Sequence, residues 1–257
     1  MSAKLLEGKI ALVTGGGTGI GFGTARRMAE EGSTVYISGR RFDVLEKSAK
    51  KIGENVIPIQ ADISIKTDME RVASVIESRH GALDILFANA GYCLSESLPD
   101  ITEEFIDRMY NSNIKGTLFT VQSMLPILRE GASIILTSSM TAMIGLPGYT
   151  CYAATKCAIR GMAKVWTTEL KSRKIRVNVV SPGAIPTEGY ETVQGMTPEE
   201  VQEFMNRCSQ EIPAGRGGDP KELGDAVVFL ASDMSTFVNG ENITVDGGQT
   251  QVYAGRL

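Results

Sequence analysis

A tyrosine and a lysine stand four residues apart in the middle of the chain, where Tyr152 and Lys156 belong to the stretch YTCYAATK. On a helix, residues i and i+4 lie on the same face, so the two side chains can meet. A cation beside a tyrosine stabilises its phenolate and lowers its pKa from about 10, so the pair can exchange a proton. Tyr149 lacks this spacing. Tyr152 is therefore the candidate acid/base, unless the two residues form only a solvated surface pair.

The elements that would position this pair follow a repeating pattern along the 257 residues. Short apolar runs predict strands near residues 9–15, 33–39, 55–61, 83–89, 133–139, 175–183 and 241–248. Helical patterns lie between them, near residues 20–31, 42–51, 66–79, 102–128, 149–172 and 219–231. Such alternation is typical of βαβ units. We expect one doubly wound, Rossmann-type α/β domain over residues 1–257, with a mostly parallel seven-stranded sheet and helices on both faces.

Composition narrows the possible partners and location. The net charge is −4 and no dense basic run is present, which argues against nucleic acid as a partner. We find no secretion signal and no apolar run of about 18 residues, so we expect a cytoplasmic protein that does not enter a membrane. The 4 cysteines form no CxxC pair and the chain has 1 histidine, so we expect no metal site.

A glycine-rich segment, TGGGTGIG at residues 14–21, follows the first predicted strand and opens the first helix. Glycines there allow a tight turn and bring backbone N–H groups close to a pyrophosphate at the helix N-terminus. A flexible turn is the alternative, but the position between strand and helix favours a dinucleotide site. The predicted contacts are Gly15, Gly17, Thr18, Gly19, Ile20 and Gly21.

With Tyr152 and Lys156, the spacing G-x-x-x-G-x-G in this segment resembles the short-chain dehydrogenase/reductase family over nearly the whole chain. FANAG at 87–91 is similar to the family's NNAG element, with Ala88 in place of its first asparagine. Four further elements follow in the family's order: NIKG, TSSM, PGAIPT and the closing VDGG. The resemblance implies a hydride-transferring oxidoreductase that acts on a ketone or a secondary alcohol with a nicotinamide cofactor.

The resemblance also implies a catalytic set, which consists of Asn113, Ser139, Tyr152 and Lys156. Ser139 would hydrogen-bond the substrate oxygen, and Asn113 would hold a water in a proton relay to Lys156. Ser138 is the rival of Ser139, and Asn111 is the rival of Asn113. The interval to the tyrosine favours Ser139, and the N-x-K-G pattern favours Asn113. The other implied cofactor contacts are Asp62 and Ile63 at the adenine, then Asn89, Ala90, Gly91, Tyr152, Lys156, Pro182, Gly183, Ile185 and Thr187.

The end of the second predicted strand decides between NAD and NADP. An acidic residue there would bond the ribose 2′-OH, but VYISGRR has Gly39 at that position, followed by Arg40 and Arg41. A guanidinium facing a 2′-phosphate makes charge-assisted bonds worth roughly 1.5–3 kcal/mol each. We therefore expect NADP(H), although Thr18 stands where many NADP-linked relatives carry a basic residue. Two alternatives stay open: an NAD-linked dehydrogenase whose arginines only cap the next helix, and a non-catalytic dinucleotide-binding sensor.

The substrate is expected beneath a lid segment at about residues 184–212. The lid contains a short helix with Thr197 as N-cap, Pro198 in its first turn and Glu200 completing a capping box. Its apolar side chains suggest a lipophilic ketone, and such segments often move. The expected pocket residues are Ser139, Tyr149 and Tyr190, with Tyr92, Cys93, Leu94 and residues 140–149 nearby.

The helix that carries Tyr152 has a second apolar face. Its small residues recur at helical spacing: Ala154, Ala158, Gly161 and Val165. Either a neighbouring helix of the same chain or a second subunit could cover them. Members of the resembled family commonly associate through this helix and the last strand. We therefore expect a homotetramer or a homodimer, with the tail at 249–257 against a neighbouring subunit.

Overall fold

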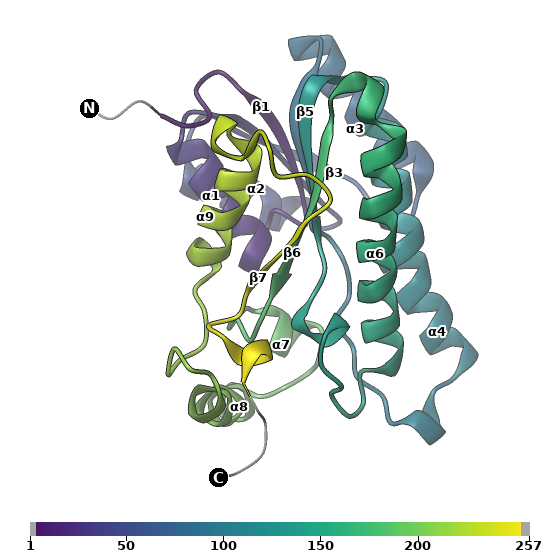
Figure 1. Ribbon diagram of the computed structural model, residues 1–257, viewed down its shortest axis with the longest axis vertical. Coiled ribbons are helices and arrows are strands. Elements are labelled where there is room, and N and C mark those ends of the chain that lie inside the picture. The colour runs from purple at the N-terminus through teal and green to yellow at the C-terminus, as the bar shows by residue number, and fades with distance from the viewer. Residues whose placement is uncertain (1–3, 253–257) are drawn as a thin grey trace.

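Seven parallel strands form one sheet in the computed structural model, which describes residues 4–252 (Figure 1). The strand order is β3-β2-β1-β4-β5-β6-β7. The strands are β1 Ile10–Thr14, β2 Thr34–Gly39, β3 Val56–Gln60, β4 Leu83–Ala88, β5 Leu128–Thr137, β6 Arg176–Pro182 and β7 Asn242–Val245. This is the Rossmann-type arrangement that the sequence predicts. The order reverses between β1 and β4, where such sheets bind ligands.

Helices cover both faces of the sheet, as Figure 1 shows. They are α1 Gly19–Glu30, α2 Phe42–Ile52, α3 Lys66–His80, α4 Glu103–Tyr110, α5 Thr117–Met124, α6 Thr150–Glu169, α7 Gly189–Thr192, α8 Pro198–Glu211 and α9 Pro220–Ala231. Helices α1, α2 and α9 pack on one face through Val13 and Ile37, and α3, α5 and α6 pack on the other through Leu12. Leu12 and Val13 are consecutive in β1 and point to opposite faces of the sheet, and both are buried because helices cover both faces. Within residues 4–252, no helix is long and apolar enough to cross a membrane.

The continuous helix expected over residues 102–128 is interrupted, so that prediction is wrong. A π-helix at Asn111–Gly116 separates α4 from α5. The hydroxyl of Thr117 donates to the main-chain oxygen of Asn113 at 2.8 Å. A π turn winds the backbone more widely than an α turn and is frequent at functional sites. Here it holds Asn113, which is 1% exposed, against the middle of the molecule.

The fifth strand begins at Leu128 and ends at Thr137, whereas the sequence predicts residues 133–139. Leu128 pairs with Leu83 of β4, and the register between the two strands then shifts. The residues that follow Leu128 are exposed, and Gly131 has a φ of 78°. An exposed glycine in the left-handed region is typical of a turn, so the sequence pattern conceals the start of this strand.

The expected lid helix is α8, and its capping box is present. The Thr197 hydroxyl accepts from the Glu200 amide at 3.2 Å, and the Glu200 carboxylate accepts from the Thr197 amide at 2.8 Å. The one-turn helix α7 precedes it and was not expected from the sequence. Figure 1 places α7 and α8 together at the end of the sheet.

The second apolar face of α6 is not covered by another helix of the described chain. Val165 is 55% exposed, Ala154 and Gly161 are also exposed, and a Cβ placed on Gly161 would meet nothing within 4 Å. The alternative of an intrachain partner is therefore wrong for residues 4–252. The end of the tail, residues 253–257, lies outside the described residues.

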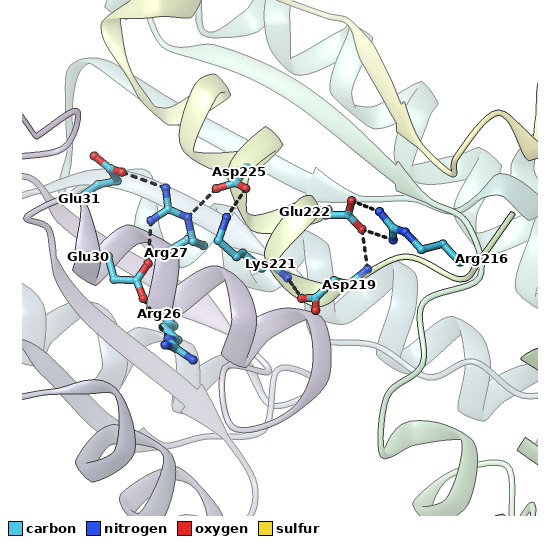
Figure 2. Close-up of polar contacts among 9 residues, drawn as sticks. All are labelled: Arg26, Arg27, Glu30, Glu31, Arg216, Asp219, Lys221, Glu222 and Asp225. Carbon is cyan, nitrogen blue, oxygen red and sulfur yellow. Dashed lines mark hydrogen bonds and ion pairs between the residues drawn. The ribbon is translucent and has the colours of Figure 1, made fainter. Parts of the chain in front are cut away.

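A network of charged side chains joins α1 to α9 and to Arg216 in the segment before α9 (Figure 2). Arg27 is its centre: its guanidinium bonds Glu30 at 2.7 Å, Glu31 at 2.9 Å and also Asp225 of α9. Its side chain is 15% exposed, and these carboxylates raise its pKa despite the opposing effect of burial. The network holds α1, which opens with the glycine-rich segment, against its neighbour.

We expect Arg27→Ala to lower the free energy of unfolding by about 1–3 kcal/mol, because it removes charge-assisted bonds and leaves carboxylates without a partner. Arg26→Ala is the matched control, since Arg26 is 61% exposed and, within residues 4–252, pairs only with Glu30. It should cost less than about 0.5 kcal/mol. Urea unfolding followed by circular dichroism measures both, and equal losses would contradict the central position of Arg27.

Candidate active site

A cavity of about 600 Å³ opens at the carboxyl ends of the strands, where β1 and β4 diverge. Every residue predicted to contact the cofactor lines it. These are Gly15, Gly17, Thr18, Gly19, Ile20, Gly21, Arg40, Arg41, Asp62, Ile63, Asn89, Ala90, Gly91, Tyr152, Lys156, Pro182, Gly183, Ile185 and Thr187. The predicted pocket residues Ser139, Tyr149 and Tyr190 line its other end. Asn113 is the one residue of the predicted catalytic set outside the lining.

The glycine-rich segment forms a cradle that side chains would fill. Gly15 has a φ of 67°, and a Cβ on Gly21 would lie 2.1 Å from the main-chain oxygen of Gly15. Thr18, the N-cap of α1, makes no side-chain bond to the helix N-terminus. Backbone N–H groups at the start of α1 therefore face the cavity and fit the pyrophosphate of a dinucleotide.

A carboxylate from the lid already contacts this helix end. The amide of Gly19 donates to Glu188 Oε2 at 3.1 Å, across 169 residues of chain. The side chain of Thr187 packs against the same glycine, because a Cβ on Gly19 would lie 2.9 Å from Thr187 Cγ2. Glu188 therefore uses an N–H group that a pyrophosphate would use. Nothing in the sequence pattern pointed to this contact.

The carboxyl ends of β1 and β4 are fastened together beside the cradle. The hydroxyl of Thr14 accepts from the amides of Asn89 and Ala90, at 3.0 and 3.1 Å. The amide side chain of Asn89 donates to the main-chain oxygen of Thr14 at 3.0 Å. These three bonds fix the position of the FANAG element against the glycine-rich segment.

Lys156 lies at the centre of the site and is 3% exposed. Its ammonium group donates to the main-chain oxygen of Thr137 at 2.9 Å. The hydroxyl of Ser138 donates to the main-chain oxygen of Lys156 at 2.8 Å. These bonds join α6 to the end of β5. The Ser138 hydroxyl is used in this connection and does not line the cavity, whereas Ser139 does line it. Burial lowers the pKa of Lys156 to about 8.

Tyr152 lies on the same face of α6, with its ring centroid 5.5 Å from the Lys156 ammonium. The Ser139 hydroxyl and the Cys93 thiol are neighbours of its hydroxyl that influence its pKa. Burial raises the pKa of Tyr152 well above its usual value. Desolvation of the phenolate is the largest influence on this pKa, and it opposes the lowering expected from Lys156. Tyr152 is therefore a neutral phenol that can donate its proton.

Asn113 lies behind the catalytic pair rather than in the cavity wall. Its side-chain oxygen accepts from the Tyr92 amide at 2.8 Å, and its side-chain nitrogen donates to Tyr92 O at 2.9 Å and to Thr155 at 3.1 Å. A Cβ on Gly91 would lie 2.8 Å from Asn113 Oδ1 and 3.8 Å from Lys156 Nζ, so these groups share one neighbourhood. The rival Asn111 is exposed.

The arginines at the end of β2 sit at the far end of the cavity. The guanidinium of Arg40 donates to the hydroxyl of Tyr92 and lies 5.1 Å from its ring centroid. Arg108 stacks on the same ring at 4.7 Å. Arg41 is the exposed N-cap of α2, and its side chain makes no bond to the helix. Both Arg40 and Arg41 remain on the cavity wall, where a phosphate could reach them.

The substrate end differs from expectation in two places. Leu94 does not line the cavity and instead packs beside Met109. Arg108 lines it without any sequence signal, because its place depends on how α4 packs against the loop at Tyr92. As expected for a lid, its residue Gln194 donates to Cys93 Sγ at 3.6 Å, beside Tyr152.

Comparisons with known proteins agree with this geometry. A family model described as Enoyl-(Acyl carrier protein) reductase matches residues 15–250. The 3-oxoacyl-[acyl-carrier-protein] reductase FabG of Thermotoga maritima is 38% identical over 248 residues, which cover 95% of this chain and 98% of that protein. A short-chain type dehydrogenase/reductase from Mycobacterium marinum superposes with a TM-score of 0.88 at 31% identity, covering 96% of this chain and 98% of that one.

The chain belongs to the short-chain dehydrogenase/reductase family. A third similar protein is the 3-ketoacyl-(acyl-carrier-protein) reductase from Brucella melitensis complexed with NADH. It has a TM-score of 0.86 and 31% identity, covering 95% of this chain and 99% of that one. This short-chain dehydrogenase/reductase is accordingly an oxidoreductase for CH–OH or C=O groups, and its glycine cradle suits the dinucleotide on which such enzymes depend.

We expect Glu188→Gln to tighten binding of the reduced dinucleotide about two- to fivefold, because it removes an anion that competes for the N-terminus of α1. Fluorescence titration of the purified enzyme measures this affinity. Glu191→Gln is the matched control, since Glu191 is exposed on the same segment, and it should leave affinity unchanged. Weaker binding by Glu188→Gln would contradict competition at this site.

Proposed function

We propose that this short-chain dehydrogenase/reductase reduces a ketone at the expense of NADPH, with Tyr152 as the proton donor. The observation that carries the proposal is the buried Tyr152 side chain on the wall of the cavity, where Ser139 and Lys156 also lie. The other end of the cavity is the glycine cradle. An assembled donor and a dinucleotide cradle within one cavity argue against a non-catalytic sensor.

The chain's own residues would orient the carbonyl and deliver a proton. When bound, the reduced nicotinamide supplies a hydride to the carbonyl carbon. The Ser139 hydroxyl would hold the carbonyl oxygen beside Tyr152, and its main-chain anchor is the Thr141 amide, which donates to Ser139 Oγ at 3.2 Å. Tyr152 would then give its proton to the oxygen, and the nearby cation of Lys156 would stabilise the phenolate that remains.

Burial favours reduction over oxidation in this assignment. Alcohol oxidation needs Tyr152 as a phenolate, and burial raises the pKa of that hydroxyl. Ketone reduction needs the neutral phenol, which is the form that burial stabilises. Asn113 is proposed as a positioning residue that fixes Tyr92 and Thr155 around the pair, and its role in a water relay stays a prediction.

NADPH is proposed over NADH because cations and no carboxylate follow β2. Gly39 carries no side chain to accept a ribose hydroxyl, and Arg40 and Arg41 line the same wall. The alternative of an NAD-linked enzyme draws support from the Brucella melitensis relative, which was complexed with NADH. The relatives' names also suggest a ketone on an acyl carrier as one possible substrate class.

The proposal also covers the oligomeric state of the enzyme and its place in the cell. We expect a cytoplasmic homotetramer or homodimer, supported by the open face of α6 at Ala154, Gly161 and Val165. Small residues on an exposed helix face allow a second helix to approach closely. Light scattering that gives the mass of a single 27.6 kDa chain in the active enzyme would contradict this expectation.

We expect Tyr152→Phe to lower kcat for ketone reduction by at least about a hundredfold, because one general acid contributes about 10²–10⁴. NADPH should still bind, as fluorescence titration will show. Tyr149→Phe is the matched control: its ring lies 6.1 Å from that of Tyr152, and it should cost less than about fivefold. If Tyr149→Phe were the inactivating change, the assignment of the proton donor would be wrong.

The cofactor assignment is tested by Gly39→Asp combined with Arg40→Ala. A Cβ on Gly39 would meet only the Leu45 side chain, at 3.6 Å, so the aspartate fits. We expect the ratio of kcat/KM for NADPH to that for NADH to fall at least about tenfold, since one charge-assisted bond is worth that much. Lys50→Ala, on the far end of α2, is the control. A parent enzyme that prefers NADH would overturn the assignment.

A further inference from the structure

Aromatic side chains line the substrate end of the cavity. Tyr149 lies edge-on to Tyr152, with ring centroids 6.1 Å apart and an interplanar angle of 63°. Opposite, Tyr190 of α7 packs on Phe204 of α8, with centroids 5.4 Å apart. Burial raises the pKa of both Tyr149 and Tyr190, as expected for hydroxyls away from water. Planar apolar groups gain most from such walls, because aromatic faces and edges pack on one another.

Apart from Lys156, this end of the cavity has one cation among the described residues, the guanidinium of Arg108. Among the described residues that line the whole cavity, the charged ones are Arg40, Arg41, Asp62, Arg108 and Lys156. Arg40, Arg41 and Asp62 belong to the cofactor end. Arg108 is stacked on Tyr92, and Lys156 is bonded to Thr137. A negatively charged group among the rings would therefore lose its hydration, and Arg108, beside Tyr92, is the one described cation there that could replace it.

The lid itself is strongly acidic. Between residues 184 and 212 it carries one basic residue, Arg207, and six exposed glutamates: Glu188, Glu191, Glu199, Glu200, Glu203 and Glu211. The same lid supplies Tyr190, Gln194 and Phe204 to the cavity wall, so these charges lie on the segment that covers the substrate, although none of the six glutamates lines the cavity. Like charges repel at this range unless salt screens them.

We infer that the substrate is an uncharged, ring-containing ketone that enters free, rather than an acyl group carried on a phosphorylated thioester. The inference rests on the proposed function. In the reaction, the ketone gains a hydride at carbon and the Tyr152 proton at oxygen, and the dihydronicotinamide is oxidised by the same two electrons. Because Gln194 meets Cys93 beside Tyr152, a small free ketone can be enclosed, whereas a tethered acyl group must hold the lid open.

The test compares three ketones with the intact enzyme and NADPH, repeated with NADH. α-Tetralone is the uncharged bicyclic probe, acetoacetyl-CoA is the phosphorylated thioester, and acetoacetyl-N-acetylcysteamine is the same thioester without phosphate. We expect kcat/KM for α-tetralone to exceed that for acetoacetyl-CoA at least tenfold. The uncharged thioester should exceed acetoacetyl-CoA severalfold at low salt, and the difference should shrink as ionic strength rises.

Substitutions test the charge of the lid and the rings of the pocket separately. Glu199→Lys combined with Glu203→Lys should raise kcat/KM for acetoacetyl-CoA at least threefold and leave that for α-tetralone unchanged. Tyr190→Ala should raise KM for α-tetralone at least fivefold, whereas Tyr190→Phe, which keeps the ring, should not.

Two other outcomes would contradict either the substrate class or the proposed function. Acetoacetyl-CoA reduced as fast as α-tetralone, with no dependence on salt, would overturn the inferred substrate class and leave the proposed reductase intact. No oxidation of either cofactor with any of the three ketones would instead overturn the proposed function on which the inference rests.

Discussion

A buried ammonium group determines how the rest of the site is built. Lys156 is almost without solvent, and its cation is held by the main-chain oxygen of Thr137 at the end of β5. A buried charge is costly unless it is bonded, so α6 cannot shift along the sheet without leaving it unsatisfied. The Ser138 hydroxyl adds a second bond at the same place. These contacts fix Tyr152 relative to Ser139, as the proposed proton transfer requires.

The sheet brings the two ends of the cavity together. The reversal of strand order between β1 and β4 opens a crevice at their carboxyl ends, and Thr14 fastens the two edges through Asn89 and Ala90. The glycine-rich segment leaves from β1, and the lysine-bearing helix follows β5 on the opposite face. A dinucleotide that spans the crevice would therefore connect the N-terminus of α1 with the phenol of Tyr152.

Most of this arrangement could be predicted from the sequence, because it depends on local patterns. Strand runs, the glycine spacing and the interval between Tyr152 and Lys156 each specify geometry within a few residues. The π-helix at Asn113, the early start of β5 and the contact of Glu188 with Gly19 were not predictable. Each of these depends on partners distant in the chain. The pKa of Tyr152 was also mistaken, since spacing reveals the neighbouring cation but not the depth of burial.

The pH dependence of ketone reduction tests the central claim most directly. Reduction needs a protonated Tyr152 and a charged Lys156, and burial sets the pKa of Lys156 at about 8 while raising that of Tyr152. The account predicts that kcat/KM for the ketone is constant below about pH 7 and falls about tenfold per pH unit above the pKa of Lys156. A rate that stays constant to about pH 10, or one that rises with pH, would contradict it.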